Sequence, residues 1–244
     1  MHDEVKMRVR RIYRELEGLM QEMLVLLQAM EKQEKSDTGR DTLASTGVLW
    51  QACDEMVELE KMGLPGLCVQ KAVQYKEMLE DAIGELKEWA EGDGDDEDDG
   101  DDFAGSADED EEDEFEKMLS GCRSLPKDRA DLKEMVDAAI KKLRLTSMLF
   151  QAVVKRRLKA IPKERPQVLG EIDRLMGRLK QIPEETDELA NAFYELDHQE
   201  AKMLLEKIVG LGQASAEDVR KSWKGEEDEF TIWSGKWKEA VEKA

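Results

Sequence analysis

Residues 132–158, LKEMVDAAIKKLRLTSMLFQAVVKRRL, repeat an apolar side chain every three or four positions. That spacing places the apolar residues on one face of an α-helix and the charged residues on its other faces. The apolar positions are Leu132, Val136, Ile140, Leu143, Phe150, Val154 and Leu158. We expect one helix from Lys127 to Ile161, about 50 Å long at about 1.5 Å per residue. The apolar face of such a helix must be buried against other helices.

The same periodicity predicts helices through most of the chain, and runs of alternating β-branched residues are nearly absent. Glycine and proline punctuate the pattern, with a turn predicted at 63–66, a helix start at Pro183 and a helix end at Gly210 and Gly212. The expected helices span about residues 2–34, 45–62, 67–90, 115–119, 168–182, 183–209 and 230–241. One-sided stripes and short connections predict an all-α fold, an antiparallel bundle of amphipathic helices.

An acidic segment, residues 91–116, interrupts this pattern. It contains 17 Asp or Glu residues and no Lys or Arg. The chain has 37 basic and 58 acidic residues, so removing those 17 changes the formal charge from −21 to −4. Such a segment buries too little apolar surface to offset the entropy of ordering, and we expect a disordered, solubilising linker. The alternatives are an acidic surface for a basic partner and weak Ca²⁺ binding without EF-hand spacing.

The acidic segment divides the chain into an N-terminal helical bundle segment, residues 1–90, and a C-terminal helical segment, residues 117–244, that packs with the first. Trp50 and Trp89 fall on apolar faces of consecutive helices in the first part. We expect both indole rings to be at least partly buried.

Groups that carry out catalysis are scarce. His2 lies at the terminus, and His198 with Glu195 and Glu200 is expected to form a solvated helix face and not a metal site. There is no phosphate-binding loop, dinucleotide fingerprint or nucleophile elbow. The three cysteines lack metal-type spacing and are expected to be reduced thiols. We therefore predict a protein that is not an enzyme and has no cofactor or metal.

A basic run, Lys155, Arg156 and Arg157 with Lys159, ends the long helix. Its alternatives are a nuclear-import signal, a docking patch for a partner and the polar end of a helix, where the macrodipole favours cations. We favour the last. The net charge argues against direct nucleic-acid binding, which relies on neutralising phosphates.

A cluster of aromatic residues, Phe230, Trp233 and Trp237, lies at helical spacing near the C-terminus. It either anchors a partner protein or packs the last helix back onto its own bundle, which we expect. A helix at the end of a chain detaches at lower cost than an internal one. We therefore predict that this helix gates a groove used by a partner.

The sequences STGVLWQACDEMVELEKMGLPG (45–66) and AVQYKEMLEDAIGELKEW (72–89), followed by an acidic run, resemble the cyclin-D-interacting (GCIP, cyclin-D-binding protein) family. The later long helix and the KRRLK segment (155–159) fit the same order. The resemblance implies bundles similar to those of vinculin and α-catenin, and partners of the cyclin or helix–loop–helix type. It also suggests that the N-terminal part of the family's domain is abbreviated here.

The helical stripes and the lack of catalytic groups predict a protein-binding regulator or adaptor, and the resemblance implies a link to cell-cycle control through cyclin-type or transcription-factor partners. The alternatives are an acidic chaperone for basic, histone-like proteins and a cytoskeleton-associated helical bundle. No membrane-spanning stretch or signal peptide is present in the sequence, so we expect a cytoplasmic and nuclear protein.

Overall fold

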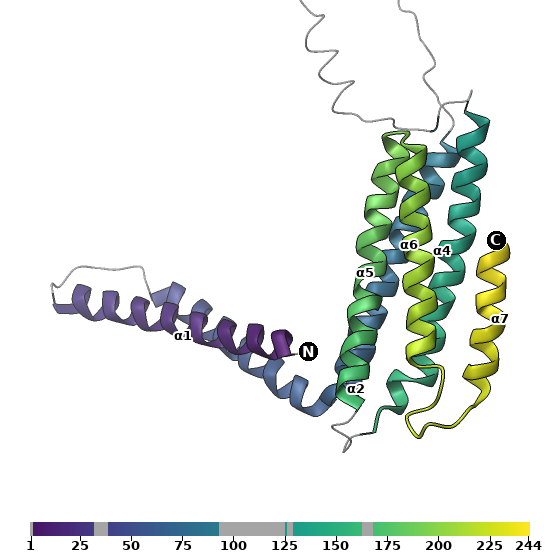
Figure 1. The fold of residues 1–244 in the computed structure, drawn as a ribbon. Helices are drawn as coiled ribbons and strands as arrows, with labels where there is room; N and C mark the ends of the chain where they lie inside the picture. Colours follow the sequence, from purple (N-terminus) through teal and green to yellow (C-terminus); the bar gives the residue numbers. More distant parts are fainter. Residues whose placement is uncertain (1, 32–38, 93–124, 126–128, 163–167) are drawn as a thin grey trace, which may run out of the picture. The chain divides into compact units, whose positions relative to one another are not determined.

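The computed structural model describes residues 2–31, 39–92, 125, 129–162 and 168–244, and all regular structure in these residues is helical. The predicted all-α fold is therefore confirmed. The elements are α1 (His2–Glu31), α2 (Gly39–Glu91), α4 (Ala130–Arg156), the 3₁₀ turn η1 (Leu158–Ala160), α5 (Leu169–Tyr194), α6 (His198–Asp218) and α7 (Glu229–Lys243) (Figure 1).

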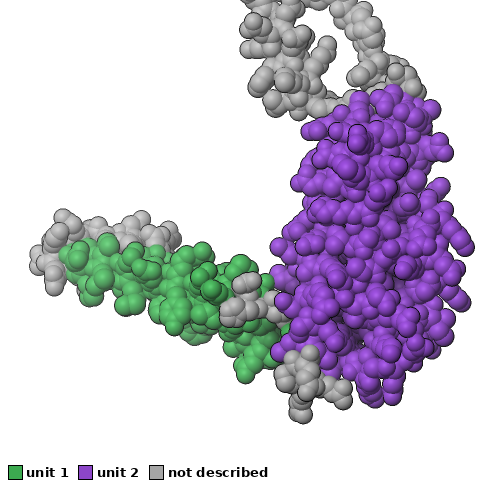
Figure 2. Space-filling view, viewed as in Figure 1, with its two compact units in different colours: residues 1–67 green, residues 68–244 purple. Residues whose placement is uncertain are grey.

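The chain separates into two compact units, residues 1–67 and residues 68–244 (Figure 2). The boundary lies within α2, close to Gly63, whose φ of 64° and ψ of −173° are not helical. Glycine adopts a positive φ at little cost, so α2 consists of two helical segments joined at this residue. The division predicted at the acidic segment is a different one. It stays a prediction, because residues 93–116 lie outside the described residues.

The second unit is a helical bundle in which α2 from Cys68 onward, α4, α5 and α6 alternate in direction and α7 packs beside α4 (Figure 1). Leucine, isoleucine, valine and phenylalanine side chains from these helices fill its core. Trp89 is buried, as predicted, with its ring 5.3 Å from that of Tyr194. The backbone N–H of Leu125 donates a hydrogen bond of 3.0 Å to the carbonyl oxygen of Trp89. The two ends of the acidic connection are thereby held together at one end of the bundle.

The first unit contains α1 and the first segment of α2, joined by polar contacts. Arg8 donates to the carbonyl oxygen of Glu55 at 2.8 Å, and Arg11 donates to the Glu55 carboxylate at 2.7 Å. The expectation that Trp50 is buried is wrong, because its side chain is 69% exposed. Its neighbours Leu49 and Ala52 are less exposed than Trp50. A unit of two helices covers only a narrow face of each, and Trp50 lies outside that face.

Several helix boundaries differ from the predicted ones. The long helix ends at Arg156, before η1, instead of continuing to Ile161. Pro183 lies inside α5 instead of starting a new helix, and α6 continues past Gly210 and Gly212 to Asp218. In α5 and α6 the bundle buries one continuous face, and this packing outweighs the local cost of a single proline or glycine. The predicted helix over 115–119 lies outside the described residues.

Candidate protein-binding surfaces

Arg157, the first residue after α4, is only 1% exposed although it carries a charge. Its Nε donates to the carbonyl oxygen of Val219 at 2.6 Å, and Nη2 donates to that of Arg220 at 3.0 Å. Two guanidinium nitrogens also donate hydrogen bonds to the carboxylate of Asp228, at 2.7 and 2.8 Å. A buried charge is tolerated only where its hydrogen bonds are made. These contacts therefore fix the connection between α6 and α7 against the end of α4.

Asp228 is also the N-cap of α7. Its carboxylate accepts hydrogen bonds from the backbone N–H groups of Phe230 and Thr231, and Thr231 Oγ1 accepts one from the N–H of Asp228. The hydrogen bond from Arg157, helped by these backbone donors, lowers the pKa of Asp228 to about 2. The carboxylate is therefore ionised at neutral pH, and the pair with Arg157 is a bidentate, charge-assisted contact. The start of α7 is anchored by the same side chain that caps it.

Aromatic side chains hold the rest of α7 in place. Trp237 is 4% exposed, and its Nε1 donates to the carbonyl oxygen of Leu145 in α4 at 2.7 Å. On the side of α6, a Cβ built at Gly212 would approach the Trp237 ring to 3.1 Å, so the ring lies close against the α6 backbone. Trp233 stacks on Trp237, with ring centroids 6.5 Å apart. The last helix is therefore packed back onto its own bundle, as the sequence favoured.

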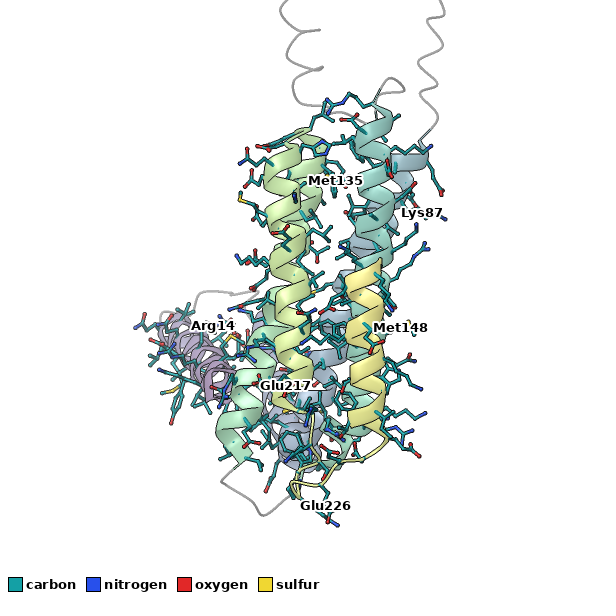
Figure 3. The ribbon with its side chains drawn as sticks, turned by 45° about the vertical axis from the view of Figure 1, so that its right-hand side comes forward. Arg14, Lys87, Met135, Met148, Glu217 and Glu226 are labelled. Atoms are coloured by element: carbon teal, nitrogen blue, oxygen red, sulfur yellow. The ribbon has the colours of Figure 1, made fainter. Side chains whose placement is uncertain are left out.

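Between α4 and α7 the side chains leave a groove with a cavity volume of about 410 Å³. The guanidinium of Arg156 and the carboxylate of Glu229 form an ion pair of 2.7 Å between its two helices. Met148, labelled on α4 beside α7 in Figure 3, is 52% exposed. We call this feature the α4–α7 groove. It is lined by Met148, Gln151, Ala152, Lys155, Arg156, Glu229, Phe230 and Trp233.

The first unit carries a second surface, on α1. None of the described side chains of this helix, residues 4–29, is fully buried. Large apolar side chains 36–69% exposed recur at every third or fourth position along one side and form what we call the α1 outer stripe. Its residues are Val5, Val9, Tyr13, Leu16, Met20, Leu24 and Leu27. Apolar residues in a continuous exposed row are typical of a surface that another helix covers.

Groups suited to bond-making chemistry are not gathered at either surface. Burial raises the pKa of the Cys68 thiol to about 11, so it is protonated at neutral pH. Among the described residues, no group of three or more His, Cys, Asp and Glu side chains is arranged to hold a metal ion. Within the same residues, no helix combines the length and the apolar character needed to cross a membrane.

Of the six residues predicted as a partner-binding site, five lie at the end of α4 and the start of α7, and Trp237 lies farther along α7, against Leu145. Arg157, Phe230 and Trp237 are buried by the chain itself, and the Arg157 guanidinium lies 4.4 Å from the Phe230 ring centroid. Lys155, Arg156 and Trp233 line the α4–α7 groove. In this conformation only the second three are available to a partner, and their role in binding stays a prediction.

Sequence reasoning missed Asp228, which joins the basic run to the aromatic cluster. The available signal was the spacing of Asp228 and Thr231 before an apolar helical pattern, which is typical of an N-cap. It also missed the α1 outer stripe. The apolar stripe predicted for this helix is split, with Ile12 and Leu19 half-buried and Val9 and Leu16 on the outer side.

The fold and these surfaces define an all-helical bundle protein with an exposed apolar stripe and a basic, aromatic groove. Residues 1–92 match the family model described as Grap2 and cyclin-D-interacting, N-terminal. The resemblance predicted from the sequence is thereby confirmed.

The chain is also similar to an uncharacterized protein of Schizosaccharomyces pombe, with 26% identity over 212 residues. The match covers 82% of this chain and 54% of the yeast protein, so the chain spans about half the length of that relative. No solved structure matches the chain, and the likeness to vinculin and α-catenin stays a prediction.

Proposed function

We propose that this protein is a non-enzymatic protein-binding regulator or adaptor, acting in cell-cycle control through cyclin-type or helix–loop–helix transcription-factor partners in the cytoplasm and nucleus. The observation that carries the proposal is the α1 outer stripe. It lies within the residues that match a family described as cyclin-D-interacting. A partner of this family would lay an amphipathic helix along the stripe, a common mode of helix recognition.

The stripe offers enough apolar surface for specific binding. Tyr13, Leu16, Met20 and Leu24 line a shallow pocket of about 400 Å³ on α1. Each of these four side chains is between 40% and 69% exposed. Full burial of such a side chain contributes about 1.5–3 kcal/mol, so covering the remaining half of all four contributes on the order of 3–6 kcal/mol.

The charges beside the stripe favour a partner with acidic residues. Lys6, Arg10 and Arg14 follow one another at steps of four along the N-terminal half of α1, and all three are exposed. Arg14 is paired with Glu15, at 2.8 Å, whereas no ion pair is seen for Lys6 or Arg10 within the described part of the chain. Carboxylates on the partner helix would meet these cations and set the direction in which it lies.

The test measures binding of the full chain to a purified D-type cyclin–kinase complex and, separately, to a helix–loop–helix domain, by biolayer interferometry. We expect one of the two to bind, and the double variant Leu16→Glu and Met20→Glu to bind about 100-fold more weakly, equivalent to roughly 3 kcal/mol. Gln28→Glu, an exposed position on the same helix outside the stripe, adds one negative charge without changing the stripe and should bind as the wild type does.

Two results would contradict the proposal. If neither class of partner binds, the cell-cycle assignment is wrong. If a partner binds and the double variant binds equally well, the recognition surface lies elsewhere. Light scattering after gel filtration separates a third case. A wild-type dimer that the double variant converts to a monomer would show that a second copy of the chain covers the stripe.

A further inference from the structure

We propose that the α4–α7 groove binds an acidic peptide segment of a partner protein, with one large apolar side chain of that segment inserted between Met148 and Trp233. This surface lies in the second unit and is separate from the α1 outer stripe, so the inference goes beyond the proposed function. It rests on three features: the apolar floor of the groove, the distribution of charge along α4, and three cations of α4 that have no ion-pair partner among the described residues.

The floor of the groove is apolar and holds its shape. Phe230 is 2% exposed and lies against the buried Arg157, while Trp233 is half-buried and stacked on Trp237. Met148 opposes them from α4 and is half exposed. A volume of about 410 Å³ lies within the range of about 300–1,000 Å³ typical of ligand pockets. One large side chain fits such a space, and the flexible thioether of Met148 can adapt to its outline.

The charge around the groove is uniformly positive along α4. From Ala138 to Lys163 the sequence contains no acidic residue, in a chain whose formal charge is −21. On the exposed face of the helix, Lys141 and Arg144 precede Met148, and Lys155 follows it, at steps of three, four and seven residues. Carboxylates spaced along an extended or helical peptide would lie opposite these cations.

The cations differ in whether they already have a partner. Arg156 is occupied by Glu229, at 2.7 Å. Lys141, Arg144 and Lys155 form no ion pair in the described residues. Along α4 itself, acidic side chains return only at Asp137 and Glu134, on the turns before Lys141. The Glu80 carboxylate of α2 also lies against α4, where it accepts a hydrogen bond of 2.8 Å from Ser147, and it is paired with Lys76. The positive field is thus confined to the half of α4 that borders the groove.

The combination favours an acidic peptide over a nucleic acid. A nucleic acid is held mainly by many phosphate contacts, and the whole-chain charge of −21 repels a long polyanion. A short acidic peptide carries fewer charges than a long polyanion and also fills the apolar slot, which a phosphodiester backbone leaves empty. An acidic peptide with a single aromatic residue therefore matches both the floor and the rim.

The experiment uses the full chain and a fluorescent peptide of sequence DEDEEDEFE, which copies residues 108–116 and has one phenylalanine among eight carboxylates. Fluorescence polarisation should show saturable binding that weakens as salt is added. Replacing the phenylalanine of the peptide with serine should weaken binding at least 10-fold. Met148→Glu and Lys155→Glu should each weaken it at least 10-fold. Their matched controls, Met203→Glu and Lys202→Glu at exposed positions on α6, should leave it unchanged.

Other results would overturn the inference. If the serine peptide binds equally well, charge alone accounts for the interaction. If Met148→Glu binds the peptide as tightly as the wild type does, the α4–α7 groove is not the binding site. Tighter binding of a single-stranded oligonucleotide of equal charge would assign the surface to nucleic acid. If the peptide binds only after residues 93–116 are deleted, the chain's own acidic segment occupies the groove. In that case a separate partner protein is not the usual occupant of the α4–α7 groove.

Discussion

Replacing Arg157 with Met tests how strongly the last helix is fixed to the bundle. The substitution keeps the length of the side chain and removes the guanidinium that binds Asp228 and the carbonyl oxygens of Val219 and Arg220. Removing one partner of a buried ion pair costs about 3–5 kcal/mol. The Asp228 side chain is 38% exposed and water can solvate it, so we expect the lower end, about 3 kcal/mol. For a unit of this size that lowers the melting temperature by roughly 6–12 °C.

Thermal unfolding followed by circular dichroism measures the effect, and Asp228→Asn provides the comparison. Asparagine is also a good N-cap, so this variant should lose the charge pair and keep the cap. In the Arg157→Met background the same change should cost little, because the pair is already broken. A melting temperature within about 2 °C of the wild type, or equal effects of Asp228→Asn in both backgrounds, would refute the argument.

The same pair predicts a dependence on pH. The pKa of Asp228 is lowered to about 2 in the folded protein from an ordinary value of 3.8. A lowered carboxylate pKa contributes stability that is fully present above pH 3.8 and is lost as the pH falls toward 2. The difference in melting temperature between the wild type and Arg157→Met should therefore narrow across this window. A difference that stays constant would show that the lost stability does not come from the charge pair.

Three further predictions concern packing. Trp89→Ala should destabilise the protein by about 3–5 kcal/mol, and Trp50→Ala by less than about 0.5 kcal/mol; equal urea midpoints would contradict the difference in burial. Gly212→Ala should lower the melting temperature, because the added Cβ meets an indole ring at 3.1 Å. Gly210→Ala has open space around its Cβ and should stabilise the protein by up to about 1 kcal/mol. If both substitutions change the melting temperature in the same direction, the close contact at Gly212 is wrong. A Glu-specific protease should cut the acidic segment first. The two fragments should co-elute in gel filtration, because α2 from Cys68 onward shares a core with α4, α5 and α6. Fragments that elute separately would contradict this prediction.

The sequence was sufficient to predict helices, because a stripe at every third or fourth residue marks the buried face whatever the partner is. It was not sufficient to place the breaks between them. Pro183 has the appearance of a helix start, yet α5 continues through it. The real break comes at Leu196, a leucine with φ of 60°, and Asp197 then caps α6. Only the packing of α5 against α6 shows that the chain must turn there.

The candidate surfaces were predictable to different degrees. The basic run and the aromatic cluster were both visible in the sequence, although 71 residues separate Arg157 from Asp228 and only the bundle brings them together. Which residues of the basic run are buried depends on how the end of α4 is rotated about its axis. A rotation by one residue would bury Arg156 in place of Arg157. The α1 outer stripe was not separable from a core stripe, because both have the same spacing. They differ only in what covers them.

The hydrogen bond between Leu125 and Trp89 has a consequence for how this protein can change over generations. Because Leu125 is hydrogen-bonded to Trp89, the chain leaves and re-enters the bundle at one point, and this contact sets no fixed number of residues between them. Doubling the length of a flexible connection costs only about 0.6 kcal/mol. We therefore expect insertions, deletions and charge changes between residues 93 and 124 to have little effect on folding. Homologous chains should vary most in that interval, while Trp89 and the packing around it stay the same.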